Sequence, residues 1–209
     1  MPARDNILNK IRKALKKPVE MPFKEAEKED YASLFHRYPE EPDVLFAENF
    51  RMQQGQFAYC ANESDFVNKL AALMETSEWK RIYCKEPALI NLLQQHDFHA
   101  LAFSNLEESE AALTTCEQLI ARTGSILLSS AQPSGRATSV YAPVHICVAY
   151  TDQVAYDISD GLNALKQKYE TLPSLITLAT GPSRTADIEK TLVVGIHGPK
   201  QVFVFLIEK

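Results

Sequence analysis

Apolar residues recur along most of the chain in two patterns. Spacings of three and four residues predict helices, at residues 4–16, 43–54, 64–76, 87–96 and 157–169. Short, nearly unbroken apolar runs predict strands, at residues 56–60, 80–84, 144–150, 174–179 and 202–207. The last three runs are expected to be buried. Helices and strands alternate from residue 43 onward, which is typical of a parallel sheet covered by helices.

The stretch between residues 111 and 130 departs from this alternation. Residues 111–121 and 125–130 are both strand-like, and Thr123-Gly124 interrupts the run between them. Short strands joined by a tight break predict a small antiparallel addition to the main sheet. We therefore expect an α/β fold with a mostly parallel sheet and a small antiparallel part.

The first 42 residues have a different character. The helix over 4–16 is apolar on one face and basic elsewhere, with Asp5 its only acid. Such a helix can dock on a partner or an anionic membrane, or lie on its own domain or a sister subunit. Residues 18–42 are rich in proline and predict a linker or a wrapping arm. We expect an N-terminal helix and arm over 1–42 and one α/β domain over 43–209.

The net charge and the hydropathy of the chain argue against two classes of function, nucleic-acid binding and membrane spanning. The 209 residues include 22 basic and 27 acidic side chains, giving a net charge of −5. This balance argues against a general nucleic-acid surface, which needs clustered lysine and arginine. No run approaches the 18 apolar residues of a membrane span, and the first residues lack the apolar core of a secretory signal. We expect a cytoplasmic protein without a transmembrane segment.

The four cysteines are too far apart to form a recognisable metal motif. They lie 24, 32 and 31 residues from one another, and no pair has the Cys-x-x-Cys spacing of zinc or iron–sulfur sites. Cys60, Cys84 and Cys147 lie in apolar runs and are expected to be reduced and buried, while Cys116 is the candidate for a reactive thiol. We expect no metal and no cofactor in this chain.

The histidines give no metal motif either. His96 and His99 bracket Asp97, but a third ligand is not apparent. His145 lies inside the apolar run 144–150 and is expected to be a core residue.

The densest group of chemically capable residues follows the run 174–179. It comprises Gly181, Ser183, Arg184, Thr185 and Asp187. Ligands of open α/β sheets bind beyond the carboxyl ends of the strands, and a glycine there permits close backbone approach. The hydroxyls are donors, Arg184 is a planar fork for carboxylate or phosphate, and a helix beginning before Ile188 would add N–H groups. The alternative is a loop that caps this helix, with Arg184 paired to Asp187 or Glu189.

Two further groups of candidate residues lie before and after this one in the sequence. His197 and Gly198 lie in a turn over 195–199, where the imidazole is either a proton donor or acceptor for a ligand or a tie that fixes the turn. Thr123 and Gly124 interrupt the strand-like middle, and the polar loop 132–139 carries Arg136 as a second partner for an anion. The alternative for this loop is a solvated connection.

Three stretches that contain these groups resemble the lactate utilization protein C family, which contains the LUD domain. They are residues 117–129, 134–148 and 179–206. The string GPSRTADIE at 181–189, followed by G-x-HGP at 195–199, is the most specific part. The opening ILNKIRKAL at 7–15 is also similar to the family's beginning.

The resemblance implies a fold, a pathway and partners. It implies a three-layer α/β/α fold similar to the NagB/RpiA/CoA-transferase group. It also implies a role in oxidising L-lactate to pyruvate, alongside two partner proteins that hold the iron–sulfur clusters. The resemblance gives no catalytic residue, so the residues named above are carried over as motif positions only.

Three hypotheses for the function remain. The first is a non-redox subunit of a lactate-oxidising complex that binds a small carboxylate or phosphate. The second is an autonomous enzyme acting on a sugar phosphate or an acyl-CoA, although Glu117 lies in a strand-like run and not in the glycine-flanked turn of a CoA-transferase nucleophile. The third is an interaction module that uses the basic helix. Homo-oligomerisation and catalysis by the isolated chain stay open.

Overall fold

A computed structural model describes residues 3–16, 40–102, 105–188 and 191–209, with the side chains of 102, 186–188 and 191–192 excepted. The chain divides into two units, Met1–Tyr38 and Pro39–Lys209. The first contains helix α1 (Ala3–Leu15), which confirms the first predicted helix. Most of the predicted arm, residues 17–39, lies outside the described residues. None of the helices within the described ranges combines the length and apolar character that a membrane span requires.

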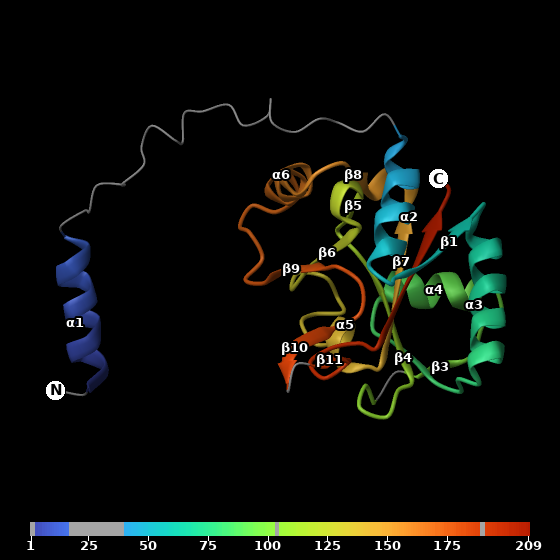
Figure 1. Cartoon of the computed structure of the whole chain (residues 1–209), viewed down its shortest axis with the longest axis horizontal. Coiled ribbons are helices and arrows are strands. Elements are labelled where there is room, and N and C mark those ends of the chain that lie inside the picture. Colours follow the sequence, from blue (N-terminus) through green and yellow to red (C-terminus); the bar gives the residue numbers. More distant parts are fainter. Residues whose placement is uncertain (1–2, 17–39, 103–104, 189–190) are drawn as a thin grey trace. The chain divides into compact units, whose positions relative to one another are not determined.

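The second unit is built on a sheet of six parallel strands (Figure 1). Their order is β1 (Gln56–Cys60), β12 (Gln201–Ile207), β7 (Val144–Tyr150), β4 (Ala111–Thr115), β2 (Ile82–Cys84) and β3 (Leu101–Ala102). The two longest strands, β7 and β12, pair with each other along their full lengths and lie inside the sheet. This position explains why their sequences are almost continuously apolar.

Two helices cover one face of the main sheet. Helix α3 (Glu63–Ser77) begins at Asn62, whose side chain accepts a hydrogen bond from the Asp65 N–H at 2.9 Å. Helix α4 (Pro87–Gln95) begins with proline, which has no N–H to leave unsatisfied there. Their apolar faces pack on the strands in one core, which includes Phe66, Leu70, Leu93, Ile146 and Phe205.

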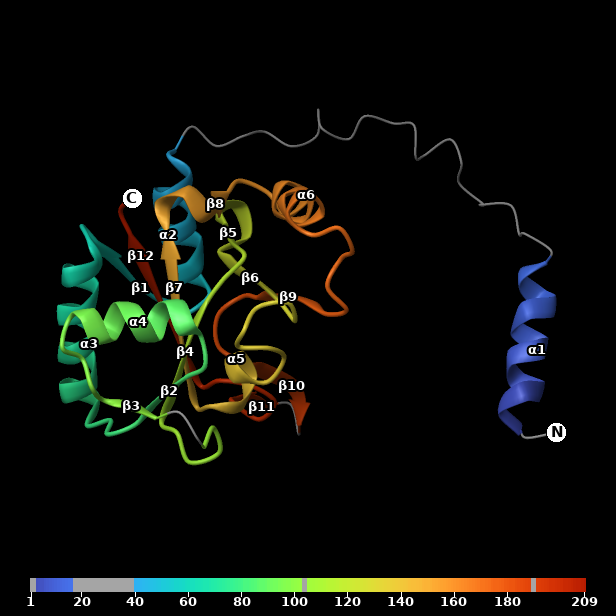
Figure 2. The ribbon, with the colours of Figure 1, turned by 180° about the vertical axis from the view of Figure 1, so that it is seen from behind.

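A helix and a second sheet cover the opposite face. Helix α2 (Pro42–Met52) buries Phe46 and Phe50 against the strands. Beside it lies a four-stranded sheet with the order β8 (Val154–Ala155), β5 (Gln118–Ile120), β6 (Ser125–Ser129) and β9 (Ile176–Ala179). Helix α6 (Ile158–Lys168) lies beside this sheet (Figure 2). Its Leu165 packs in a small core with Ile120 and Leu127.

The remaining elements are short. Helix α5 (Thr138–Tyr141) precedes β7, and single 3₁₀ turns occupy Ala121–Thr123 and Thr151–Gln153. Strands β10 (Arg184–Ile188) and β11 (Thr191–Val194) form an antiparallel hairpin. The predicted fold class, a mostly parallel sheet with small antiparallel additions, is therefore confirmed.

Three strand predictions need correction. The strand-like stretch 111–121 divides at Cys116 and Glu117 into β4 and β5, which belong to different sheets. The run 174–179 is not a buried strand: β9 is an edge strand of the small sheet, and its Leu178 side chain is 39% exposed. The strand predicted over 80–84 begins only at Ile82.

Candidate functional site

Three hydroxyl groups connect two of the motif groups found in the sequence. The Thr123 and Ser125 hydroxyls lie 2.8 Å apart, and Ser125 Oγ lies 2.7 Å from Thr180 Oγ1. Strands β6 and β9 pair antiparallel, with Ile126 opposite Ala179, and this register sets Ser125 beside Thr180. The sheet pairing therefore brings the Thr123-Gly124 break next to the start of the 181–189 motif.

Two glycines of these groups pack against the C-terminal end of α2. Gly124 has φ +60° and Gly181 has φ +73°, a backbone region that other residues rarely adopt. A Cβ atom on Gly124 would collide with the backbone of Asn49 and Phe50, and one on Gly181 would collide with the carbonyl oxygen of Gln53. The predicted close backbone approach is thus observed at both glycines, but the group that they approach is the end of helix α2.

Arg184 is directed at the same helix end. Its Nη2 atom donates a hydrogen bond to the carbonyl oxygen of Gln53, the residue that ends α2. A cation at this position interacts favourably with the partial negative charge of the helix C-terminus. The bond uses one of the five N–H donors of an exposed guanidinium.

The expected helix before Ile188 is wrong, because residues 184–188 form strand β10. Arg184 lies opposite Val194 in the ladder and Thr185 opposite Val193. In a hairpin, alternate backbone N–H groups bond to the partner strand and the others point away from it, so the motif does not present the converging N–H groups of a helix start. Thr185 is half-buried, and the side chain of Asp187 lies outside the described residues, as does Glu189.

The turn over 195–199 folds back onto Ser183. The Ser183 N–H donates to the carbonyl of Pro199 at 2.9 Å, and the Gly195 N–H donates to the carbonyl of Ser183 at 2.9 Å. A Cβ on Gly198 would lie 2.9 Å from Cβ of Ser183. His197 is exposed at this turn. The structure thus brings the turn of His197 to the base of the hairpin that carries Arg184.

Arg136 makes a different contact. Its Nη2 atom donates to Oγ of Ser174 at 2.5 Å, just before β9, and the side chain is exposed. Its neighbour Thr138 is buried and begins α5. The structure gives no contact between Arg136 and Arg184.

A buried carboxylate that the sequence did not single out lies between β4 and β5. The Glu117 side chain is 1% exposed and accepts hydrogen bonds from Ser129 Oγ at 2.5 Å, Tyr169 OH at 2.9 Å and Lys168 Nζ at 2.7 Å. These donors come from β6 and from the end of α6, so no local sequence pattern could reveal the group. Three donors hold this carboxylate in place.

A cavity of about 610 Å³ lies at the carboxyl edge of the main sheet. It is lined by Asn62, Glu63, Ser64, His96, Tyr150, Glu208 and Lys209. The Tyr150 hydroxyl donates to Glu63 at 2.8 Å, and burial together with this carboxylate raises the pKa of Tyr150 to about 12. General rules place ligands at this edge, whereas the motif 181–189 follows a strand of the other sheet.

His145, Cys60, Cys84 and Cys147 are core residues, as the sequence predicted. His145 is 1% exposed, and Nε2 lies 2.9 Å from the hydroxyl of Thr114. Burial lowers the pKa of His145 to about 4. All four cysteines are free and buried, including Cys116, the candidate for a reactive thiol. Among the described residues, no three histidine, cysteine, aspartate or glutamate side chains are grouped as metal ligands.

Comparison with known families identifies a domain family. The model of the LUD domain family matches residues 44–207, which covers both sheets and every motif group discussed above.

The individual relatives differ in how much of their length aligns with this chain. Uncharacterized protein NMB1437 of Neisseria meningitidis is 28% identical over 99% of this chain and 94% of its own length. Lactate utilization protein C of Deinococcus radiodurans is 35% identical over 51% of this chain and 50% of its own length, and that of Bacillus subtilis is 31% identical over 48% and 43%. The alignments therefore span about half of each lactate utilization protein C.

One solved structure has a similar fold. The crystal structure of a DUF162 family protein from Deinococcus radiodurans aligns with a TM-score of 0.60, covering 81% of this chain and 99% of that one. The two sequences are 18% identical, so this structural similarity indicates a shared fold and gives no information on function.

Proposed function

Because the chain belongs to the LUD domain family, we propose that it serves lactate utilization as a non-redox subunit of a complex that oxidises L-lactate to pyruvate. Partner proteins of this complex hold the iron–sulfur clusters and carry the electrons. The present chain binds a small carboxylate or phosphate and positions it. The observation that carries this proposal is the 31–35% identity to proteins named lactate utilization protein C.

The placement of the cysteines supports this division of labour. Burial raises the pKa of Cys60 and Cys84 to about 11, which keeps both as neutral thiols at physiological pH. Cluster ligation needs several thiolates within reach of one site. In the described part of the chain the four thiols are components of the core, so clusters fit better on a partner.

The base of the β10–β11 hairpin is the proposed anion site. Ser183 and Thr185 supply hydroxyl donors, and Arg184 has N–H groups beyond the one that contacts Gln53. His197 is exposed on the turn that folds back onto Ser183. These groups together favour a negative ligand of low molecular weight.

Complementation and co-purification test the role in the pathway. A strain that lacks this gene should lose growth on L-lactate and regain it with the wild-type gene. The tagged chain should recover iron-containing proteins from lactate-grown cells, while the chain purified alone should not turn over lactate. Normal growth of the deletion strain would overturn the proposal, and turnover of sugar phosphates or acyl-CoA esters by the isolated chain would favour the autonomous enzyme.

Calorimetry tests the anion site separately. Titration with L-lactate, pyruvate and phosphate should show binding that Arg184→Ala weakens about tenfold or more, because a charge-assisted hydrogen bond is lost. Arg81→Ala is the matched control, since it removes an exposed arginine outside the hairpin, one that pairs with Glu108. Equal affinities of the wild type and Arg184→Ala would remove Arg184 from the site.

A further inference from the structure

Exposed apolar side chains gather beside the base of the β10–β11 hairpin. Val140 and Tyr141 of helix α5 are 44% and 56% exposed. Val194 at the end of β11 and Ile196 in the turn after it are 39% and 44% exposed. Single exposed apolar residues are normal, but a group of them on neighbouring elements indicates a contact surface. These four residues are called the apolar face below.

The two parts of the apolar face are held together by the backbone. The Lys200 N–H donates to the carbonyl oxygen of Pro143 at 2.7 Å, which ties the turn after β11 to the segment that follows α5. Both views of the ribbon show α5 beside the hairpin (Figure 1, Figure 2). Val194 lies opposite Arg184 in the ladder, and side chains of opposite residues lie on the same face of a sheet. The apolar face therefore borders the proposed anion site.

The segments around the apolar face carry basic and no acidic side chains. Although the chain has 27 acidic residues and a net charge of −5, three segments contain no aspartate or glutamate: residues 130–143, 171–186 and 191–200. They contain Arg136, Arg184 and Lys200, all exposed, and within the described part of the chain none of these forms a salt bridge. The side chains of Asp187 and Glu189, between the last two segments, lie outside the described residues. The chemistry of this surface is therefore apolar with cationic borders.

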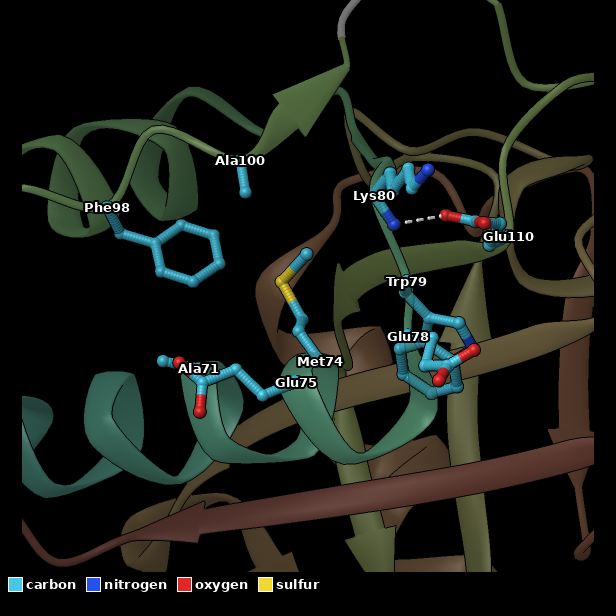
Figure 3. Close-up of a pocket in the computed structure, with 9 residues that line it drawn as sticks. All are labelled: Ala71, Met74, Glu75, Glu78, Trp79, Lys80, Phe98, Ala100 and Glu110. Carbon is cyan, nitrogen blue, oxygen red and sulfur yellow. Dashed lines mark hydrogen bonds between the residues drawn. The ribbon is translucent and has the colours of Figure 1, made fainter.

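The cavity in Figure 3 has a different character. Its volume is about 810 Å³, and residues of α3 and of the segments before β2, β3 and β4 line it. Its Met74 and Phe98 side chains are 6% and 8% exposed and belong to the core. Glu75, Glu78 and Glu110 make its border acidic. The apolar face at the hairpin is the one with apolar side chains open to a partner.

We infer that the apolar face is the docking site for a partner protein whose own surface is apolar at its centre and acidic around it. The inference rests on the proposed function, in which this partner is the iron–sulfur protein of the complex. Aromatic residues and arginine are enriched at protein interfaces, and complementary charges steer association. Tyr141 is then the aromatic anchor, and Arg136 and Lys200 face the acidic groups. The small acid held near Arg184 lies at the contact between the two proteins.

Charge argues against two other occupants. A symmetric contact between two copies sets the same patch against itself, so the basic groups of both copies would repel one another. Helix α1 carries four basic side chains and one acidic one, and it therefore has the same sign of charge as this surface. An acidic partner avoids both kinds of repulsion.

Binding of the isolated partner tests the inference. The probe is the iron-containing protein that co-purifies with the tagged chain from lactate-grown cells, purified separately with its clusters intact. Its binding to the full-length chain is measured by biolayer interferometry. Val140→Glu with Tyr141→Glu places acidic groups in the apolar face and should weaken binding about tenfold or more. Val44→Glu with Met52→Glu is the matched control, since it makes the same change at side chains of α2 that are 49% and 71% exposed, and its affinity should equal that of the wild type.

A charge reversal gives an independent measurement if the double variant fails to fold. Lys200→Glu leaves every apolar side chain in place and should weaken binding about fivefold or more, because a basic group beside the acidic partner becomes acidic. It should also reduce the dependence of the affinity on salt. Lys166→Glu is the matched control, since it makes the same change in charge at an exposed lysine of α6.

Three results would overturn the inference. Absence of binding between the probe and the wild type removes it together with the proposed complex. Wild-type affinity of both the double variant and Lys200→Glu removes the docking site alone, and the growth test of the proposed function is not affected by that result. A wild-type dimer in sedimentation velocity that the double variant dissociates would assign the apolar face to a second copy instead.

Discussion

The Nη2 atom of Arg184 donates a hydrogen bond to the backbone carbonyl oxygen of Gln53, 131 residues earlier in the chain. Gly181 approaches the same carbonyl so closely that a side chain there would collide with it. The motif that resembles the family most specifically therefore fastens the base of the hairpin to the end of α2. Any ligand at this site binds to a surface whose backbone is fixed by that contact.

This close approach predicts a large difference between two glycine substitutions. Gly181 and Gly135 have φ values of +73° and +70°, but a Cβ on Gly135 would meet no atom within 4 Å. Gly135→Ala should cost about 1–2 kcal/mol of unfolding free energy, the price of a left-handed backbone. Gly181→Ala should cost at least about 1 kcal/mol more, because the collision adds strain. Urea denaturation measures both, and equal costs would show that Gln53 does not constrain this turn.

The hydroxyl chain predicts coupling between two strands of the small sheet. Ser125→Ala and Thr180→Val together should destabilise the protein by about 0.5–1.5 kcal/mol less than the sum of the single changes, because either one already breaks the bond. Ser125→Ala combined with Thr76→Val should be additive, since the Thr76 hydroxyl donates within α3. Chemical denaturation of the four proteins in each cycle gives the coupling, and an additive Ser125–Thr180 pair would contradict the observed bond.

Local signals in the sequence predicted much of the fold. The spacing of apolar residues predicted the helices over 64–76 and 87–96, and the apolar runs of β7 and β12 reflect burial on both faces. Such signals act over a few residues, so they can be read without the fold. The family resemblance added the fold type and the positions of the motifs.

The geometry of the candidate site depended on contacts that no local pattern reveals. The segment 184–188 is short and lacks a continuous apolar run, and its strand is formed by pairing with 191–194. The glycines and Arg184 were identified as residues for close approach and charge, but their partner is α2. Glu117 was missed as a buried group because its donors come from residues 129, 168 and 169.

The start of α6 predicts a stability difference that depends on pH. The Asp157 carboxylate accepts hydrogen bonds from Arg122 Nη2 at 2.8 Å and from the Ile158 N–H at 2.6 Å. The bond from Arg122 is the main cause that lowers the pKa of Asp157. The folded state therefore holds the charged form, and this stabilisation is present above the unfolded pKa of about 3.9 and is lost as the pH falls through the folded value.

Asp157→Asn keeps a capping side chain and removes this charge. The substitution should cost about 0.5–1 kcal/mol at pH 7 and progressively less below pH 4. Asp97→Asn, at an exposed loop position, should change stability little at either pH. Urea unfolding at pH 7 and at pH 3 measures the difference, and a cost of Asp157→Asn that is the same at both would contradict a role for the charge.

His145 predicts a second loss of stability at mildly acidic pH. The side chain is buried, and burial lowers its pKa from 6.5 to about 4. The unfolded chain therefore takes up a proton first as the pH falls, so stability is full above about pH 6.5 and declines toward pH 4. A shift of this size corresponds to a loss of about 3 kcal/mol at most, at 1.36 kcal/mol per pH unit.

His145→Gln should remove this decline, even if it lowers stability at pH 7 by disturbing the contact with Thr114. His197→Gln, at an exposed histidine, is the matched substitution for comparison. Parallel pH profiles of the wild type and His145→Gln between pH 7 and pH 4, measured by urea unfolding, would show that His145 is protonated equally in both states.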